Sequence, residues 1–475
     1  MRLAGELSWQ NHLRVWILKT MRRSLWAGFL AGVLAVQAAP APVPAALLIR
    51  KPGTQRFEAK LENVPVLEVL RLLHQQTGWE IFLDPQFDRQ VSAQFRDRSS
   101  GEALDLLLGS ASYALVPDKS DSAKLFIYRN NRDQATRKVQ ALPAKARTIP
   151  NELVVVLKPD KEARALASQF NAKIAGEIAK INAVRLRFED EEAATRARQL
   201  IEANGNWGDV DAVYIVERPA GPEQVSAAPL PGLALEQGKA ADGRSIIIGL
   251  VDSAVQANGM ARTDFLMPQV NLYEGERAAA TTPGHGTSMA DAIMRGLSDM
   301  KLAGSDLPVR ILPVDIYGDR ATTTSFDVAR GIAEAINGGA SIVNLSLGSP
   351  GESRVVHSII QQGHERGVLF LGAAGNSPVI TPNYPAAYNE VLAVTATDYA
   401  GNPASYANRG DFVDIGGPGT ARVQFNNRTY LITGTSAATA YNSGVAAALV
   451  AKQAYTAQQA GARMRTVLGV KLPQP

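Results

Sequence analysis

The sequence predicts an α/β fold for residues 244–475, a parallel sheet with helices on both faces, preceded by two small α+β domains. The first observation is a series of continuous apolar runs, at Ser245 to Val251, Val309 to Val314, Ser341 to Leu347, Gly367 to Gly372 and Val391 to Thr395. The second is helical patterning between these runs. Strands buried on both faces require such runs, and parallel strands require helical crossovers. Ligands of such sheets bind beyond the carboxyl ends of the strands.

Composition narrows the class of protein. The chain has 475 residues, too many for one ordinary core, and its 46% hydrophobic and 20% charged residues are typical of globular domains. The net charge of +4 is small and the basic residues are scattered, so nucleic acid is not a predicted partner. The absence of cysteine excludes disulfides, thiolate metal sites and cysteine nucleophiles.

The N-terminus has the organisation of a secretory signal. A basic segment at Met21 precedes an apolar run from Leu25 to Val36, and small residues around Ala38 follow it. This order predicts a signal peptide region in residues 1–39, with cleavage near Ala38 and Met21 as an alternative translation start. The run is about half the length that spans a bilayer, which favours a signal over a permanent anchor. We therefore expect a secreted or periplasmic protein.

A compact α+β unit is predicted in residues 54–130, after a Pro/Ala-rich linker at residues 39–52. Alternation and helical spacing predict its elements. These are a strand at Arg56 to Leu61, a helix carrying Val66, Leu67, Val69, Leu70 and Leu73, strands at Trp79 to Leu83 and Val91 to Phe95, a helix capped by Ser100, and a strand at Leu125 to Tyr128.

This unit resembles the short N-terminal domain of secretins and TonB-dependent receptors. The resemblance rests on the order of elements and on the phrases LLHQQTGWEIFLD and GEALDLLLGSASYALVPD. It implies docking to an assembly of the cell envelope. The unit shows no catalytic constellation in its sequence.

A second small unit is predicted in residues 151–217, between linkers at residues 131–150 and 218–243. Its βαββαβ order is that of a ferredoxin-like domain. The elements are Glu152 to Leu157, Lys161 to Phe170, Ala172 to Ile178, Ala183 to Phe188, Asp190 to Asn204 and Val210 to Val216. The second linker is rich in Pro, Ala and Gly, and we expect processing there because its backbone has few ladder partners.

Four polar residues of the C-terminal domain are candidates for chemistry. Asp252 comes directly after the first apolar run, where a carboxylate needs a partner, and His285 opens a helix. Asn376 follows the fourth run, where its amide can donate to an oxyanion. Ser436 opens a helix of small residues, where the helix dipole favours developing negative charge. Each residue alone also fits a plain role as a turn former or helix cap.

The order Asp, His, Ser is the order of the subtilisin triad. With it, residues 245–468 resemble the subtilisin-like serine proteases. The resemblance includes the blocks around the four candidates and also NLSLG at Asn344 to Gly348, NYPAAYNEVLAVTATD at Asn383 to Asp398 and GDFVDIGGPG at Gly410 to Gly419. The ferredoxin-like domain just upstream then resembles the inhibitory propeptide of these proteases.

The resemblance implies a role for each residue. Ser436 is the expected nucleophile, His285 the general base and acid, and Asp252 the residue that orients His285. Asn376 and the Ser436 backbone N–H are expected to bind the oxyanion. The expected substrate-binding residues are Ser346, Leu347, Gly348, Ala373, Ala374 and Gly375. Their small, apolar character favours apolar or aromatic substrate side chains.

Four positions depart from the usual pattern of the family. Ala254 and Asp291 stand where the family has Gly, Ser288 where it has a second His, and Ala440 where it has Pro. None of them removes a reacting group. The effect of these four departures on loop geometry and on the reaction rate is left open.

The sequence therefore predicts an exported, self-processing serine endopeptidase that acts on proteins or peptides and carries its own propeptide as an intramolecular inhibitor. A catalytically silent peptide-binding or scaffolding protein of the cell envelope and an acyl transferase with the same nucleophile remain as alternatives. No Asp-rich loop shows calcium-ligand spacing, and His357 and His364 have no carboxylate cluster beside them in sequence. No cofactor is predicted, and a structural calcium ion is left open although no motif indicates one.

Overall fold

The computed structural model describes residues 47–470 apart from a series of short gaps. The gaps are residues 51–55, 78, 85–86, 88, 118–122, 133–134, 136, 140–145, 227–232, 234, 236, 238–244, 274–280, 301–307, 378–380, 399–400 and 405. The predicted signal peptide region lies outside the described residues. In the part of the chain that is described, no helix is both long and apolar enough to cross a bilayer.

A seven-stranded sheet forms the centre of the C-terminal domain, and every neighbouring pair of its strands is parallel. In spatial order the strands are β14 (Val270–Asn271), β15 (Val309–Asp315), β13 (Ile246–Asp252), β17 (Ala340–Leu345), β18 (Leu369–Ala373), β19 (Val391–Thr397) and β20 (Ile415–Pro418). The predicted parallel sheet and its five strands are confirmed, with β14 and β20 in addition. The fourth run begins as a strand only at Leu369, because Gly367, at φ 88°, closes the preceding turn.

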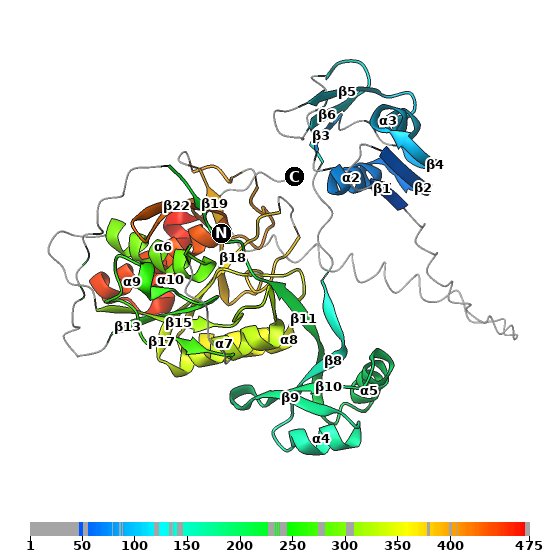
Figure 1. Cartoon of the computed structure of the whole chain (residues 1–475). Helices are drawn as coiled ribbons and strands as arrows, with labels where there is room; N and C mark the ends of the chain where they lie inside the picture. Colours follow the sequence, from blue (N-terminus) through cyan, green and yellow to red (C-terminus); the bar gives the residue numbers. More distant parts are fainter. Residues whose placement is uncertain are drawn as a thin grey trace, which may run out of the picture.

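Helices cover both faces of this sheet (Figure 1). They are α6 (His285–Asp299), α9 (Thr435–Gln453) and α10 (Ala457–Leu468) on one face, and α7 (Ser325–Asn337) and α8 (Arg354–Glu365) on the other. Each face of the sheet has its own hydrophobic core, and the strand residues pack into one core or the other. Ile248 and Leu250 lie under α6 and α9, whereas Val251 lies under α7 and α8.

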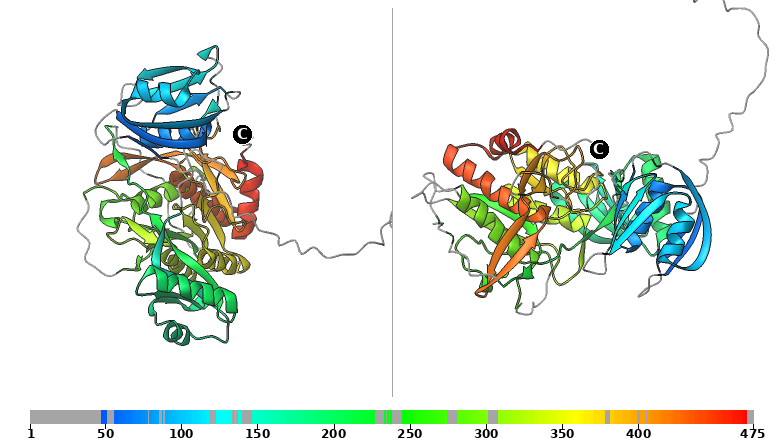
Figure 2. Two further views of the ribbon diagram at one scale, coloured as in Figure 1. Left: turned by 90° about the vertical axis from the view of Figure 1, so that its right-hand side faces the viewer. Right: turned by 90° about the horizontal axis from the view of Figure 1, so that it is seen from above.

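Helices α6 and α9 pack closely because glycines face the partner backbone, and the view from above in Figure 2 shows them side by side in green and orange. A Cβ atom on Gly296 would lie 2.0 Å from the Tyr441 carbonyl oxygen, and one on Gly444 would lie 2.1 Å from that of Ile293. No side chain fits at such distances. Because α6 begins at His285 and α9 contains Ser436, this packing fixes the two helices that carry candidate residues.

The ferredoxin-like unit contributes a sheet that continues into the C-terminal domain. Its elements are β8 (Thr148–Leu157), α4 (Ala163–Gln169), β9 (Lys173–Ile178), β10 (Ala183–Arg187), α5 (Glu191–Asn204) and β11 (Gly208–Glu217). The predicted βαββαβ order is confirmed. The sheet order is β16-β11-β8-β10-β9, in which β16 (Thr322–Thr324) belongs to the C-terminal domain. Helices α4 and α5 cover one face, and the other face packs on α7 and α8.

An ion-pair network anchors this unit to α7. Arg185 of β10 contacts Glu152 of β8 (Nη2 to Oε2, 2.5 Å) and Asp327 of α7 (Nη1 to Oδ2, 3.3 Å). Glu152 is also paired with Arg187 (2.7 Å), and Asp327 with Arg330 (3.2 Å). Because Glu152 and Asp327 are buried, both carboxylates depend on these partners.

The N-terminal unit is a body of its own with two small sheets (Figure 1). Its elements are β1 (Leu47–Arg50), β2 (Arg56–Pro65), α2 (Val66–Thr77), β3 (Glu80–Leu83), β4 (Gln90–Ser99), α3 (Ser100–Leu108), β5 (Ser112–Pro117), β6 (Ala123–Tyr128) and β7 (Arg137–Lys138). The sheets have the orders β1-β2-β4 and β5-β6-β3-β7. The predicted elements are confirmed, and β1, β5 and β7 are additional.

Two linker predictions and one cap prediction need correction. Strand β1 lies in the first predicted linker, and both β7 and the start of β8 lie in the linker predicted at residues 131–150. Strands β1 and β7 are too short to show alternation in sequence. Helix α3 is capped by Ser99 instead of Ser100, because Ser99 and Glu102 form a reciprocal capping box.

Candidate active site

Asp252 and His285 form a buried hydrogen-bonded couple at the carboxyl end of the sheet. Asp252 ends β13, His285 begins α6, and they are 0% and 3% exposed. His285 Nδ1 lies 2.9 Å from each carboxylate oxygen, and Ser253 adds a backbone N–H bond of 2.6 Å to Asp252 Oδ1. Because Nδ1 faces the carboxylate, it carries the ring proton, and Nε2 remains as the basic nitrogen.

The start of α6 is held in place by neighbours of this couple. The Gln256 side-chain oxygen accepts the Gly284 N–H (2.7 Å) and the Thr287 hydroxyl (2.6 Å). Gly286 donates its N–H to Ser253 Oγ (3.0 Å), and a Cβ at Gly286 would lie 2.0 Å from the Ser253 carbonyl oxygen. Gly286 therefore permits the close approach of the two backbones.

Ser436 occupies the first turn of α9, beyond the sheet. The helix cap is Gly434, at φ 153°, and no side chain caps the helix, so Ser436 does not have the plain capping role. Its hydroxyl donates to the Ser346 carbonyl oxygen (3.1 Å), and the Ser346 hydroxyl donates to the Ser436 carbonyl oxygen (3.0 Å). Among the described residues, the hydrogen-bond partners of the Ser436 hydroxyl thus include Ser346 and not His285.

Asn376 follows β18 and is oriented by the residue before Ser436. Its side-chain oxygen accepts the Thr435 N–H (2.8 Å) and the Thr435 hydroxyl (3.1 Å), which leaves the amide nitrogen to face the cleft. A Cβ at Gly434 would lie 2.9 Å from that nitrogen, so glycine is needed there. Asn376 therefore presents a donor beside Ser436, as predicted.

A cleft of about 410 Å³ contains Ser436 and Asn376. Ser346, Leu347, Gly348, Ala373 and Gly375 line it, as the sequence predicts. The prediction for Ala374 is wrong. Ala374 is fully buried and donates its N–H to the Val394 carbonyl oxygen, because successive residues of an extended segment point to opposite sides.

Two cleft residues were missed in the sequence. Asn383 donates to the Ala373 carbonyl oxygen (3.0 Å), and Asn408 accepts the Ser377 N–H (3.0 Å). Both line the cleft. Asn383 opens one of the quoted blocks and could have been singled out, whereas nothing in the sequence marks Asn408.

The first part of the linker predicted at residues 218–243 crosses this region in a fixed conformation, and we call residues 215–225 the strap. On one side β11 pairs with β16, and on the other β12 (Glu223–Gln224) pairs with β22 (Arg428–Thr433). The Arg218 N–H donates to Ala321 (2.8 Å), and the Val225 N–H donates to Thr429 (3.0 Å). The expectation of few ladder partners is therefore wrong for the strap.

The strap runs between the two parts of the candidate site, Ser436 in the cleft and the Asp252–His285 couple. Pro219 lines the cleft with Ser436. Two residues later, a Cβ at Gly221 would lie 3.4 Å from the carbonyl oxygen of Pro283, which is two residues before His285. Two extended residues span about 7 Å, so Ser436 and the Asp252–His285 couple face one short stretch of chain.

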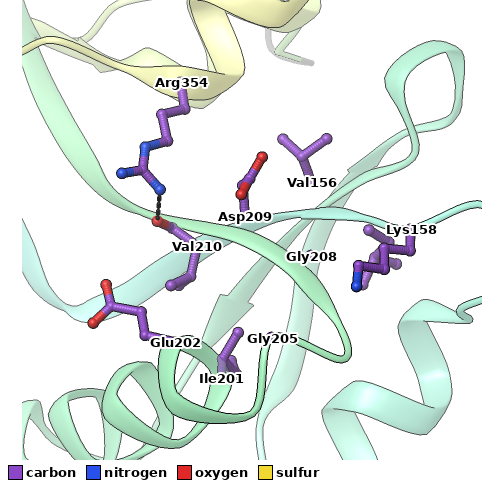
Figure 3. Close-up of a pocket in the computed structure, with 10 residues that line it drawn as sticks. Val156, Lys158, Ile201, Glu202, Gly205, Gly208, Asp209, Val210 and Arg354 are labelled. Atoms are coloured by element: carbon purple, nitrogen blue, oxygen red, sulfur yellow. Dashed lines mark hydrogen bonds between the residues drawn. The ribbon is translucent and has the colours of Figure 1, made fainter.

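A second hollow, of about 560 Å³, lies between the ferredoxin-like unit and the start of α8 (Figure 3). Its lining includes Lys158, Glu202, Asp209 and Arg354, whose Nη1 donates to the Val210 carbonyl oxygen (3.4 Å). Every residue predicted for the active site lies outside this lining. The hollow belongs to the interface, not to the cleft.

Asp211 of β11 caps α8 across the same interface. Its Oδ2 accepts the Arg354 N–H (2.7 Å), and its Oδ1 accepts the Ala212 N–H (2.8 Å). Ser353, the cap residue of α8, makes no side-chain cap bond of its own. Burial raises the pKa of Asp211 above its ordinary value. The first turn of α8 therefore relies on the ferredoxin-like unit.

The four departures from the family pattern sit in ordered surroundings. Ser288 donates to the Gly284 carbonyl oxygen (2.9 Å), and Asp291 is paired with Arg295 (2.7 Å). Ala440 is fully buried in α9, and Ala254 is half-buried. They leave the Asp252–His285 couple intact.

One of the two histidines left over from the sequence, His357, has structural partners. His357 stacks on Tyr388 with ring centroids 4.3 Å apart, and its Nε2 lies 3.0 Å from Glu390. Within the described residues, no group of three or more His, Cys, Asp or Glu could hold a metal ion.

Comparison with known proteins finds two matching families. The subtilase family model matches residues 243–469, and that of the fervidolysin N-terminal prodomain matches residues 134–213. M-protease of Shouchella clausii (strain KSM-K16) is 32% identical over 224 residues, which cover 46% of this chain and 58% of that protein. Subtilisin Savinase of Lederbergia lenta is 31% identical over 224 residues, which cover 46% of this chain and 82% of that protein.

A solved structure shows the same fold. The crystal structure of fervidolysin from Fervidobacterium pennivorans, a keratinolytic enzyme related to subtilisin, has a TM-score of 0.52 and 21% sequence identity. The likeness covers 67% of this chain and 57% of that chain.

Proposed function

Because the chain belongs to the subtilase family of serine endopeptidases and carries a fervidolysin-like prodomain, we propose that it is an exported, self-processing endopeptidase with Asp252, His285 and Ser436 as its triad. The observation that carries this proposal is the buried Asp252–His285 couple at the sheet edge where Ser436 lines the cleft. A protein that only binds peptides has no need of a buried carboxylate hydrogen-bonded to Nδ1 of His285.

The geometry suits acyl transfer to water. Ser436 Oγ attacks the peptide carbonyl carbon while His285 Nε2 takes the hydroxyl proton and then gives it to the leaving amine. Asp252 keeps Nδ1 protonated and stabilises the imidazolium. Asn376 and the Ser436 N–H donate to the oxyanion, and water then releases the acyl group by the reverse steps.

Substrate binding follows from the cleft walls. Residues 346–348 present a backbone edge to which a peptide can add as a strand, as the strap does at β16. Leu347, Ala373 and Gly375 form a small, apolar floor, which supports a preference for apolar or aromatic side chains. Cleavage profiling of a peptide library tests this, and a strict acidic or basic preference would contradict it.

Export and docking form a separate part of the proposal. The charge and apolar order of residues 21–39 supports export, and the resemblance of the N-terminal unit to secretin and TonB-receptor domains supports docking to an envelope assembly. Cell fractionation with and without residues 21–39 tests the export. Recovery of both forms in the cytoplasm would contradict it.

The enzymatic proposal has a direct test. The chain starting at Met21 is expressed as wild type and as Ser436→Ala, and its size and labelling by a fluorophosphonate probe are followed. Cleavage between Val216 and Ser245 and labelling are expected in the wild type, and both are lost in the variant. Ser377→Ala is the matched control, because this exposed serine lies in the same cleft. Identical, unlabelled wild type and Ser436→Ala chains would overturn the proposal.

A further inference from the structure

The register of the strap shows which peptide bond faces Ser436. Arg218 is bonded to Ala321 on the incoming side, and Glu223 is paired with Leu431 on the outgoing side. Between them, Pro219 lines the cleft with Ser436, and Gly221 lies at Pro283 near His285. Pro219–Ala220 is therefore the first bond of the strap between the Ser436 cleft and the turn that leads to His285.

Backbone direction identifies the partner that residue 219 lacks. In an extended chain, successive N–H groups point to opposite sides. The Arg218 N–H points to Ala321, so an N–H at position 219 would point to the opposite wall of the cleft. That wall contains Ser346, Leu347 and Gly348.

Proline has no N–H, and the Ser346 carbonyl oxygen has a different donor. The Ser436 hydroxyl donates to it at 3.1 Å. The carbonyl oxygen has a second lone pair, so a residue with an N–H at position 219 could donate to it as well, and that bond would anchor the residue before the facing peptide bond. Proline cannot form this bond.

We propose that Pro219 makes the strap an inhibitor instead of a substrate, because it cannot donate the backbone N–H that would anchor the residue before the facing bond to the Ser346 carbonyl oxygen. This inference rests on the proposed endopeptidase activity and specifies its substrate requirement. A residue with a backbone N–H must precede the bond that is cut. The intact chain then keeps the Pro219–Ala220 bond in the site uncut, and processing falls elsewhere in the linker.

The test uses the full chain from Met21 and follows intact mass and new N-termini with time. In Pro219→Ala, cleavage between residues 219 and 220 is expected about fivefold faster than in the wild type, the effect of one restored hydrogen bond. Pro222→Ala is the matched control, since it removes a proline of the same strap that lies beyond the facing bond, and it should behave as the wild type. Adding Ser436→Ala to Pro219→Ala should abolish the new cut.

Two results would overturn the inference. One is a wild-type chain cut at Pro219–Ala220 as fast as the Pro219→Ala chain. The other is a Pro219→Ala chain that a fluorophosphonate labels but that gives no new N-terminus at Ala220. Failure of the endopeptidase proposal is distinguishable, because then no form is labelled at all.

Discussion

The two halves of the proposed active site, the Asp252–His285 couple and Ser436, differ in how far they are assembled. Asp252 and His285 are already joined by hydrogen bonds of 2.9 Å in a buried environment. Ser436, in contrast, directs its hydroxyl to Ser346. In the proposed enzyme the base is therefore already assembled in the intact chain, whereas the nucleophile is bonded to Ser346. Release of the strap is then expected to restore activity without refolding of the catalytic domain.

The largest expected effect comes from breaking the assembled half. In Asp252→Asn, the side chain no longer holds His285 with Nδ1 protonated, so Nε2 loses its role as base. We expect the rate of peptide hydrolysis to fall about 10⁴-fold. The measurement is the initial rate on a chromogenic peptide after the linker has been opened by added wild-type enzyme.

Asp264→Asn is the matched control for this variant. Asp264 pairs with Arg262 at the surface of the same domain and lies outside the site. It should retain wild-type activity. A loss of less than tenfold in Asp252→Asn would contradict the proposed role of the couple.

The nucleophile half is tested by Asn376→Ala. Its amide donates to charge that develops only in the transition state, so kcat should fall about 10² to 10³-fold while KM changes little. Steady-state kinetics on the same peptide measure both parameters. Asn204→Ala, at an exposed position in the prodomain, controls for the substitution. A raised KM at constant kcat would show that Asn376 only binds substrate.

The sequence was informative where a residue follows a strong local pattern. Asp252 and Asn376 follow apolar runs, and His285 and Ser436 open helices, so their gathering at one sheet edge could be predicted. The strap could not be predicted, because Glu223 and Gln224 are polar and pair with β22 through backbone atoms alone. Ala374 was misplaced because spacing does not show to which side a residue of an irregular segment points.

Contacts between domains could also not be predicted from the sequence. Asp211 caps α8 from another domain, and its sequence neighbours carry no sign of that distant partner. Asn408 reaches the cleft from a loop between two strands, where no periodicity constrains side-chain direction. Such contacts depend on the packing of whole domains.

Helix α6, which carries His285, also contains a buried carboxylate, that of Asp291, whereas helix α9 contains no acidic residue. Burial raises the pKa of Asp291 to about 6 from an ordinary value of 3.8, despite its pairing with Arg295. The folded state therefore keeps this proton at a pH where the unfolded state has lost it. The free energy of unfolding should fall by about 2 kcal/mol through this group as the pH rises from 4 to 6.

Calorimetric unfolding in the Ser436→Ala background, with and without Asp291→Asn, measures this dependence. The asparagine variant should lack the decline. Asp264→Asn supplies the opposite comparison, because hydrogen bonding to Arg262 lowers the pKa of Asp264 and its stabilisation is lost as the pH falls. An unchanged slope in Asp291→Asn would contradict the buried, protonated state.

The smallest expected effect concerns how firmly the prodomain holds the strap in place. Arg185 joins the prodomain to Asp327, whereas Arg187 pairs with the same Glu152 without touching the catalytic domain. Arg185→Ala should weaken docking by about 2 kcal/mol, since Arg187 and Arg330 still compensate the two carboxylates. Fluorophosphonate labelling of the unprocessed chain should then be roughly thirtyfold faster, and Arg187→Ala should stay within about threefold of the wild type. Equal acceleration by both variants would mean that the charge around Glu152, and not the contact across the interface, holds the prodomain.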